Sequence, residues 1–247
     1  MEYATWAPFY DEIAREFGFA FDREERSADR LEALLPLVAR SESLARVRAR
    51  LAGRDVLVVG LAPRAGPPPI WRLPATDRPL AVVAADGATA ACLDAGLVPA
   101  VIVTDLDGPI PAEVGANRRG SLVVVHAHGD NLDAVEEWVP QFPAELAGSW
   151  AGPPRPALFD VGGFTDGDRA VFLAEHSGAR RILLWGFDFE TVDEPDPSAR
   201  ARKRAKLHWA RRLIAELARS GRSPILVWAR DGSLTPYPAG NNVESTR

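Results

Sequence analysis

Two aspartates one residue apart, Asp105 and Asp107, are the side chains of this sequence best placed for metal chemistry. They follow the apolar run 101–103, which predicts a buried strand, and Gly108 then turns the chain away. Ligands of an open parallel sheet bind just past the carboxyl ends of its strands. Two carboxylates there could hold a hard cation such as Mg²⁺ and, through it, a polyphosphate. A strand end capped by acidic turn residues has the same pattern, so this stretch alone leaves both interpretations open.

Polar or glycine-rich clusters follow four further predicted strands, at Gly60, Asp86-Gly87, segment 126–131 and Asp188. Parallel strands end along one edge of a sheet, so these clusters are expected to lie together. Asp86 would serve equally well as the N-cap of the helix that follows it. A random scatter of acids would not usually select successive strand ends, and the alignment therefore indicates an enzyme.

The segment 126–131, after the predicted strand 121–125, carries two histidines, His126 and His128. They alternate along the strand end and are expected to point the same way. A zinc site would need a third ligand from elsewhere, and the neighbouring carboxylates favour magnesium instead. Asp130 is therefore the better candidate here, as a further acid of a metal or phosphate site.

Only two of the 29 basic residues are lysines, Lys203 and Lys206. Their spacing places them on one face of a predicted helix, from which a mobile ammonium group could reach phosphates. Arginines surround them, so a solvated basic helix face is the alternative. The sequence has neither the GxxxxGK[ST] phosphate loop nor the GxGxxG dinucleotide motif.

The elements that must position these residues alternate between strands and helices. This order predicts an α/β fold with a mostly parallel, Rossmann-like sheet covered by helices on both faces. Proline-rich stretches at 61–79 and 140–156 are expected to be long loops. The predicted strands are 55–60, 80–84, 100–103, 121–125, 157–159, 181–185 and 225–228, and the predicted helices after residue 52 are 89–95, 132–139, 168–176 and 198–219.

The chain divides into three predicted parts. Residues 1–52 form an N-terminal helical segment, 53–235 an α/β catalytic domain and 236–247 a loose C-terminal tail. Within the first part, Ser27 is expected to start a second helix, with Ser41 or Ser43 near the start of a third. An aromatic-rich patch there is expected to pack in the core, and consists of Trp6, Phe9, Tyr10, Phe17, Phe19 and Phe21.

Composition excludes several classes of protein. The chain has 247 residues, 47% of them hydrophobic, and a formal net charge of −5, which argues against nucleic acid as the partner. With Cys92 as the single cysteine, no intrachain disulfide and no cysteine-rich zinc site can form. Neither an apolar run long enough to span a membrane nor a signal peptide is seen, so a cytoplasmic protein without membrane contact is expected.

Taken in order, these clusters resemble the archaeal 6-hydroxymethyl-7,8-dihydropterin pyrophosphokinase family, whose fold is similar to that of thiamin pyrophosphokinases. The likeness covers about residues 55–210, while the helical first 52 residues have no counterpart in the thiamin enzymes. Each motif is weak alone, but the ordered set is fairly specific. The resemblance rests on the segments 85–88, 103–108, 126–131, 163–170 and 186–188, together with Lys203 and Lys206.

The resemblance implies transfer of a diphosphoryl group from ATP to the hydroxymethyl oxygen of the pterin, with Mg²⁺ as cofactor and AMP as product. Such a step belongs to pterin biosynthesis of the folate or methanopterin type. Asp105 and Asp107 would hold magnesium, Asp130 would complete that site, and the two lysines would stabilise the phosphates. The further residues expected to bind ATP or the pterin are Asp86, Gly87, His128, Asp130, Asn131, Thr165, Asp166 and Asp168.

Several alternatives remain open from the sequence. The turn 162–168, at a helix N-terminus, could grip either a phosphate or the heterocycle, whose N–H groups would suit a carboxylate. Thiamin is a possible acceptor in place of the pterin, although segments 126–131 and 163–170 favour the pterin family. A nucleotide-sugar or glycan-handling protein and a non-catalytic nucleotide-binding module are more distant interpretations. A homodimer is expected only by analogy to the thiamin enzymes.

Overall fold

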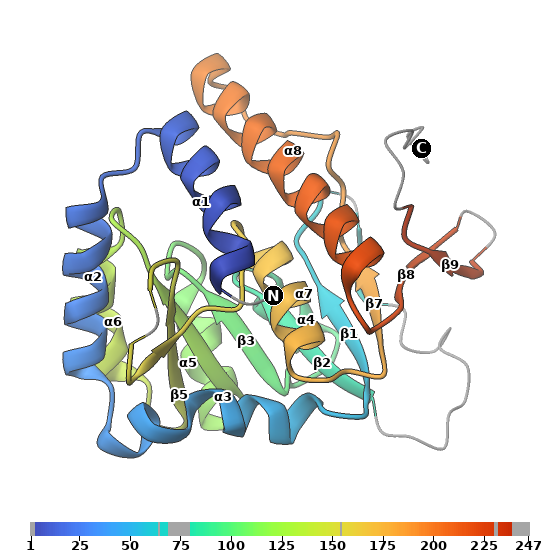
Figure 1. Ribbon diagram of the computed structural model, residues 1–247. Coiled ribbons are helices and arrows are strands. Elements are labelled where there is room, and N and C mark those ends of the chain that lie inside the picture. Colours follow the sequence, from blue (N-terminus) through green and yellow to red (C-terminus); the bar gives the residue numbers. More distant parts are fainter. Residues whose placement is uncertain (1–2, 64, 69–79, 154, 230–231, 239–247) are drawn as a thin grey trace.

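The computed structural model describes residues 3–63, 65–68, 80–153, 155–229 and 232–238. Within them, nine strands form one sheet in the order β6-β5-β4-β3-β2-β1-β7-β8-β9 (Figure 1). Neighbours pair in parallel except β8 and β9, which confirms the predicted mostly parallel α/β fold. The strands are β1 Asp55–Val59, β2 Leu80–Ala85, β3 Val101–Thr104, β4 Leu122–Ala127, β5 Leu146–Trp150, β6 Leu158–Phe159, β7 Arg181–Trp185, β8 Ile225–Trp228 and β9 Leu234–Pro236.

Helices cover both faces of this sheet (Figure 1). Successive side chains of a strand point to opposite faces, so Val56 and Val58 join one hydrophobic cluster while Leu57 and Val59 join another. The first cluster includes residues of α1, α3, α7 and α8, and the second includes residues of α2, α4, α5 and α6. The helices are α1 Tyr3–Phe17, α2 Phe21–Leu34, α3 Leu37–Leu51, α4 Ala88–Asp94, α5 Ile110–Arg118, α6 Leu132–Trp138, α7 Asp166–His176 and α8 Pro197–Ser220.

The N-terminal segment is helical, as predicted, and shares its core with the sheet. Trp6 is fully buried in the first cluster, whereas Phe21, expected in the core, is 53% exposed. The predicted start of the second helix at Ser27 is wrong, because α2 begins at Phe21. Ser27 is buried in mid-helix and its hydroxyl donates to Oδ1 of Asn131 at 2.9 Å. The third helix spans Leu37–Leu51 but is kinked at Glu42, whose backbone angles are non-helical, so its second helical stretch begins beside Ser43, in agreement with the start predicted at Ser41 or Ser43.

Three further sequence predictions need correction. Part of the predicted loop 140–156 is β5, which pairs with β4 and β6 and buries all five of its residues. Helix α5 was not predicted, because it opens with Ile110-Pro111 and contains Gly115, although proline is well tolerated in a first helical turn. The predicted loose tail begins inside β9, and Tyr237 is buried with its N–H donating to the carbonyl of Ile225.

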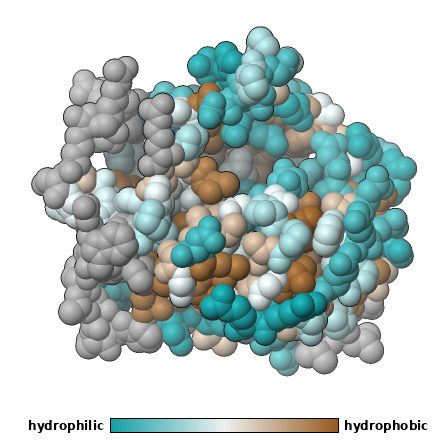
Figure 2. Space-filling model, turned by 180° about the vertical axis from the view of Figure 1, so that it is seen from behind, coloured by the Kyte–Doolittle hydropathy of each residue, from teal (hydrophilic) through white to brown (hydrophobic). Residues whose placement is uncertain are grey.

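Much of the predicted proline-rich loop lies outside the described residues, which cover only 61–63 and 65–68 of it, and the tail beyond residue 238 lies outside them too. Across the described part of the chain, every helix is too short or too polar to cross a membrane. Seen from behind, the surface gathers hydrophobic residues toward its centre and hydrophilic ones around them (Figure 2).

Asp55 anchors the first residue of the central strand β1. Its side chain is 3% exposed and accepts from Nε of Arg180 and pairs with Arg181, both at 2.7 Å. We expect Asp55→Ala to lower the free energy of unfolding by about 2 kcal/mol, less than the roughly 3–5 kcal/mol of a fully buried pair because both arginines can regain water. Urea denaturation measures the change. Asp22→Ala, which removes an exposed pair with Arg26, should change stability by less than about 0.5 kcal/mol, and equal losses would contradict the anchoring role.

Candidate active site at the carboxyl ends of the central strands

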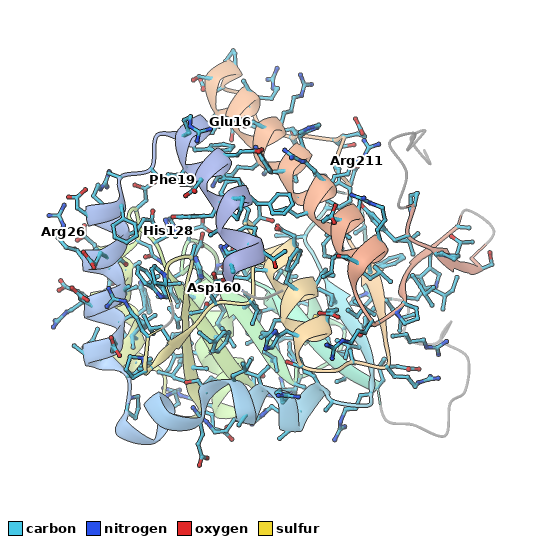
Figure 3. All side chains as sticks on the ribbon, in the orientation of Figure 1. Glu16, Phe19, Arg26, His128, Asp160 and Arg211 are labelled. Atoms are coloured by element: carbon cyan, nitrogen blue, oxygen red, sulfur yellow. The ribbon has the colours of Figure 1, made fainter. Side chains whose placement is uncertain are left out.

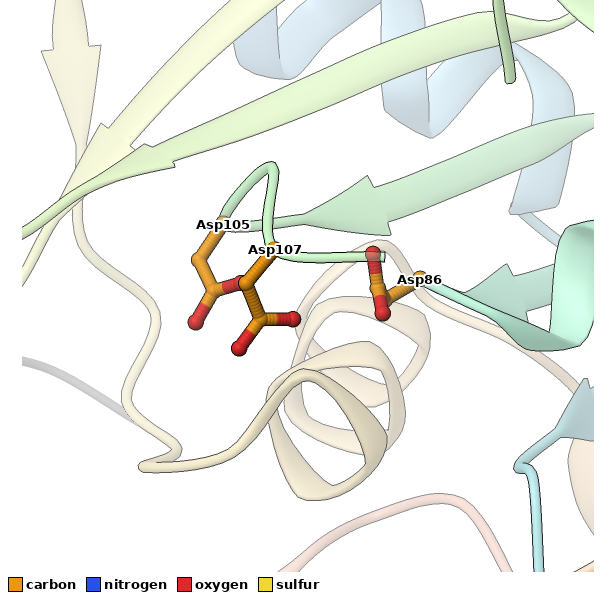
Figure 4. Close-up of side chains that lie close together, drawn as sticks. All are labelled: Asp86, Asp105 and Asp107. Carbon is orange, nitrogen blue, oxygen red and sulfur yellow. The ribbon is translucent and has the colours of Figure 1, made fainter. Parts of the chain in front are cut away.

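Five neighbouring strands, β4, β3, β2, β1 and β7, bring their carboxyl ends to one edge of the sheet. The loops that follow them carry the clusters singled out in the sequence. Asp86 follows β2, while Asp105 and Asp107 follow β3, the adjacent strand. One carboxylate oxygen from each of these three aspartates lies within 4.8 Å of the others, and we call them the carboxylate triad (Figure 4).

The backbone around the carboxylate triad is fitted closely to it. Thr104, the last residue of β3, donates its hydroxyl to Oδ1 of Asp86 at 3.1 Å and accepts from the N–H of Leu106 at 2.9 Å. Asp86 and Leu106 adopt positive φ angles of 42° and 67°. A Cβ at Gly108 would lie 2.3 Å from Oδ2 of Asp86, so only glycine admits that carboxylate. Strained backbone of this kind is typical of functional sites.

Repulsion within the carboxylate triad is the main electrostatic feature of the site. Burial, and next the charges of Asp105 and Asp86, raise the pKa of Asp107 to about 6. Burial would also raise the pKa of Asp105, but the hydrogen bond and attraction of His128 outweigh it and hold that pKa at about 2. Oδ1 of Asp105 is buried and has no hydrogen-bond partner within the described residues. A divalent cation with a preference for oxygen ligands would satisfy that atom and relieve the repulsion, so the donor set fits Mg²⁺.

Glu113, in the first turn of α5, is a buried acid behind the carboxylate triad that the sequence did not single out. Burial, and next the charge of Asp86, raise its pKa to about 9, so it is neutral at pH 7. An acid in a first helical turn is common, and this one carried no signal that could distinguish it.

The structure does not bring Asp130 into the carboxylate triad. Its carboxylate pairs with Arg23 of α2 at 3.1 Å, and its side chain is 53% exposed. Asp86, predicted only to bind ATP or the pterin, takes the third place instead.

His128 and Asn131 lie beside the carboxylate triad in different roles. Nε2 of His128 is 3.3 Å from Oδ2 of Asp105. The amide of Asn131 is fully used, because it donates to the carbonyls of Asp105 and His126 and accepts from Ser27 and the N–H of His128. Asn131 therefore holds two strand ends and α2 together, with no polar atom left for a ligand.

His126 lies close to His128, with ring centroids 6.5 Å apart, but its surroundings differ. It is 3% exposed, its Nδ1 lies 3.0 Å from Oγ of Ser149, and burial lowers its pKa well below the usual range. The grouping of possible metal ligands found among the described residues contains carboxylates only, as expected for magnesium rather than zinc.

The N-terminus of α7 faces the carboxylate triad. Thr165 and Asp168 form a capping box, in which the buried carboxylate of Asp168 accepts from the N–H groups of Phe164 and Thr165 at 2.6 and 2.8 Å. Asp166 pairs with Arg169 at 3.1 Å, and burial, followed by the charge of Asp105, raises its pKa well above the usual range. Asp168 is thus committed to the helix cap, while Asp166 adds a fourth acid near the carboxylate triad.

Two cavities adjoin the carboxylate triad. The larger, with about 900 Å³ of space free of atoms and partly open to solvent, is lined by Asp86, Gly87, Thr165, Asp166 and Lys203, among others. Gly60 and Gly186 also line it, and a Cβ on either would lie 2.6 Å or less from the carbonyl oxygen of the other. The smaller cavity, with about 420 Å³ of space free of atoms that also includes open solvent, is lined by Asp105, His126, His128 and Lys206, and by residues of the N-terminal helices.

The two lysines of α8 reach different cavities. Exposed Lys203 lines the larger cavity, whereas half-buried Lys206 lines the smaller one beside Asp105. The attraction of Lys206 also opposes the rise in the pKa of Asp107. Negative and positive groups thus face each other across the space where the cavities meet the carboxylate triad, as a metal-bound polyphosphate requires.

The chain is similar to known proteins over most of its length. Residues 40–194 match the family model described as 6-hydroxymethylpterin diphosphokinase MptE-like. A 6-hydroxymethyl-7,8-dihydropterin pyrophosphokinase of Methanothermobacter thermautotrophicus is 40% identical over 238 residues, which cover 92% of this chain and 100% of the relative. Proteins of the same name from Pyrococcus furiosus and Methanocaldococcus jannaschii are 37% and 35% identical over 92% and 76% of this chain, and over 98% and 80% of their own lengths.

Proposed function

The chain belongs to the MptE-like family of 6-hydroxymethylpterin diphosphokinases, and we propose that it transfers a diphosphoryl group from ATP to 6-hydroxymethyl-7,8-dihydropterin. The observation that carries the proposal is the carboxylate triad at the junction of two cavities, each with a lysine in its wall. A two-substrate transfer needs two adjacent sites and a focus of charge compensation between them. The pterin is favoured over thiamin because all three relatives carry the pterin enzyme's name.

In the proposed reaction a bond forms between the hydroxymethyl oxygen and the β-phosphorus of ATP. The bond from that phosphorus to the oxygen bridging it to the α-phosphate breaks, AMP leaves, and the hydroxyl proton passes to a base. Asp86, Asp105 and Asp107 would hold magnesium, with Asp86 in the place first assigned to Asp130. When bound there, magnesium supplies charge neutralisation for the transferring group.

The larger cavity is the proposed ATP site. The first turn of α7, half-buried at Asp166 and Gly167, lies in its wall, and a helix N-terminus is a common binding place for a phosphate. Lys203 would balance phosphate charge from the helix above, and Lys206 would do so on the acceptor side.

The assignment is tested by incubating the protein with ATP, Mg²⁺ and either 6-hydroxymethyl-7,8-dihydropterin or thiamin, and measuring AMP. AMP should appear only with the pterin. AMP formed only with thiamin would mean that thiamin is the acceptor instead of the pterin. Intact ATP in both incubations would refute diphosphoryl transfer to these substrates.

Lysine substitutions on α8 test the phosphate role. Lys206→Ala is expected to lower kcat/KM for ATP by about 10²-fold, and Lys203→Ala by about 10-fold because its side chain is more exposed. Arg204→Ala, an exposed cation on the same helix, is the matched control and should change kcat/KM less than about twofold. Equal effects of all three substitutions would indicate that the two lysines belong to a solvated basic face of the helix and do not contact phosphate.

A further inference from the structure

The smaller cavity has an aromatic wall contributed by the N-terminal helices. Tyr10 of α1 and Phe19, between α1 and α2, line it together with Phe164, which precedes α7. The rings of Phe19 and Phe164 lie 6.1 Å apart between centroids. Figure 3 shows Phe19 and His128, two of the residues that line this cavity, in the region between the α1 and α2 ribbons. Flat apolar walls of this kind suit a planar aromatic heterocycle.

Glu24 of α2 is the carboxylate of this wall. It is 5% exposed and lines the cavity, and it accepts hydrogen bonds from the hydroxyl of Tyr10 and the N–H of Gly129. In the described part of the chain, no lysine or arginine forms an ion pair with it, whereas its neighbour Glu25 points outward and pairs with Arg155. A buried carboxylate without a cation is costly unless hydrogen-bond donors satisfy its oxygens. Two donors come from the protein, and the cavity leaves room for a ligand to supply more.

We propose that the smaller cavity is the pterin subsite and that Glu24 determines specificity by accepting hydrogen bonds from the 2-amino group and N3–H of the ring. This inference rests on the proposed function and names the residue that selects its acceptor. The pterin presents those two donors side by side, and the two oxygens of a carboxylate match them. Asp105 and Lys206 line the same cavity, so a ring seated there keeps its hydroxymethyl group beside the carboxylate triad.

The test changes one hydrogen-bonding group on the protein and one on the heterocycle, so that a donor and an acceptor can be matched or mismatched. Glu24→Gln keeps the shape of the side chain but offers one acceptor and one donor. 6-Hydroxymethyllumazine has a carbonyl oxygen where the pterin has its 2-amino group, and so presents one donor and one acceptor. Relative to wild type, the variant should raise KM for the pterin by about 30-fold, leave KM for ATP within about twofold, and bind lumazine better than pterin. Fluorescence titration of the free heterocycles gives the binding order without turnover.

Glu25→Gln is the matched control, and it should retain the wild-type preference for the pterin. A purely structural role for Glu24 would weaken both heterocycles equally, so an unchanged pterin-to-lumazine ratio in a folded Glu24→Gln protein would overturn the inference. If that variant does not fold, the wild type decides, because a pterin methylated at N3 should bind at least about 10-fold more weakly and equal binding refutes the contact. In each of these failures wild-type turnover of the pterin still upholds the proposed function, whereas absent turnover refutes it.

Discussion

Asp105→Asn is expected to lower kcat for diphosphoryl transfer by about 10³-fold or more while leaving the fold intact. The substitution keeps the volume of the side chain but removes a negative charge from the carboxylate triad. The substitution relieves the repulsion that raises the pKa of Asp107 but also removes the attraction between Asp105 and His128, so the thermal unfolding temperature should stay close to the wild-type value. The measurements are AMP formation at saturating substrates and Mg²⁺ titration by calorimetry, in which the affinity for the metal should fall by at least about 10-fold.

A matched exposed acid, Asp133 in the first turn of α6, controls for the general loss of a negative charge. Asp133→Asn should keep kcat within about twofold of wild type. Asp107→Asn should behave like Asp105→Asn, because both carboxylates belong to the same group. Near-normal turnover in both Asp105→Asn and Asp107→Asn would show that the carboxylates after β3 do not bind a metal needed for the reaction.

The fold could be predicted where apolar runs and their spacing were strong, and not where local signals were mixed. β1 and β7 each contain a short run of buried branched residues, 56–59 and 182–184, and their predicted bounds agree closely with the structure. β5, Leu146–Trp150, contains Gly148 and Ser149 and lies between proline-rich segments, so its sequence is typical of a loop. What makes it a strand is pairing with β4 on one side and β6 on the other, a tertiary effect that a local pattern does not contain.

The site shows the same division between local and long-range information. Asp105 and Asp107 are close in sequence, so their proximity followed from one strand end. The proximity of Asp86 depends on β2 and β3 being neighbours, which the chain order suggested but could not fix. Glu24 comes from a helix far away in sequence and lacks any local motif, so only the packing of α2 against the sheet reveals it.

The third carboxylate is the point at which sequence and geometry disagree most sharply, and a pair of variants separates them. Asp130 was expected to complete the metal site, yet it pairs with Arg23 in an exposed position, while Asp86 lies within 4.8 Å of the other two aspartates. We therefore expect Asp86→Asn to lower kcat by about 10²-fold to 10³-fold and to weaken Mg²⁺ binding by at least about 10-fold.

Asp130→Asn removes one negative charge from the same edge of the sheet. It should leave kcat and the affinity for Mg²⁺ within about threefold of wild type, because it breaks only an exposed ion pair. Asp86→Asn also loses a hydrogen bond acceptor for Thr104, so Thr104→Val is needed to separate orientation from ligation. Thr104→Val should reduce kcat less than Asp86→Asn does, since the carboxylate that would bind the metal remains. A large loss of kcat and of Mg²⁺ affinity in Asp130→Asn, with a small loss in Asp86→Asn, would contradict the geometry described above. It would show that the loop after β4 moves when the ligands bind, and that Asp130 is the third metal ligand, as the sequence predicted.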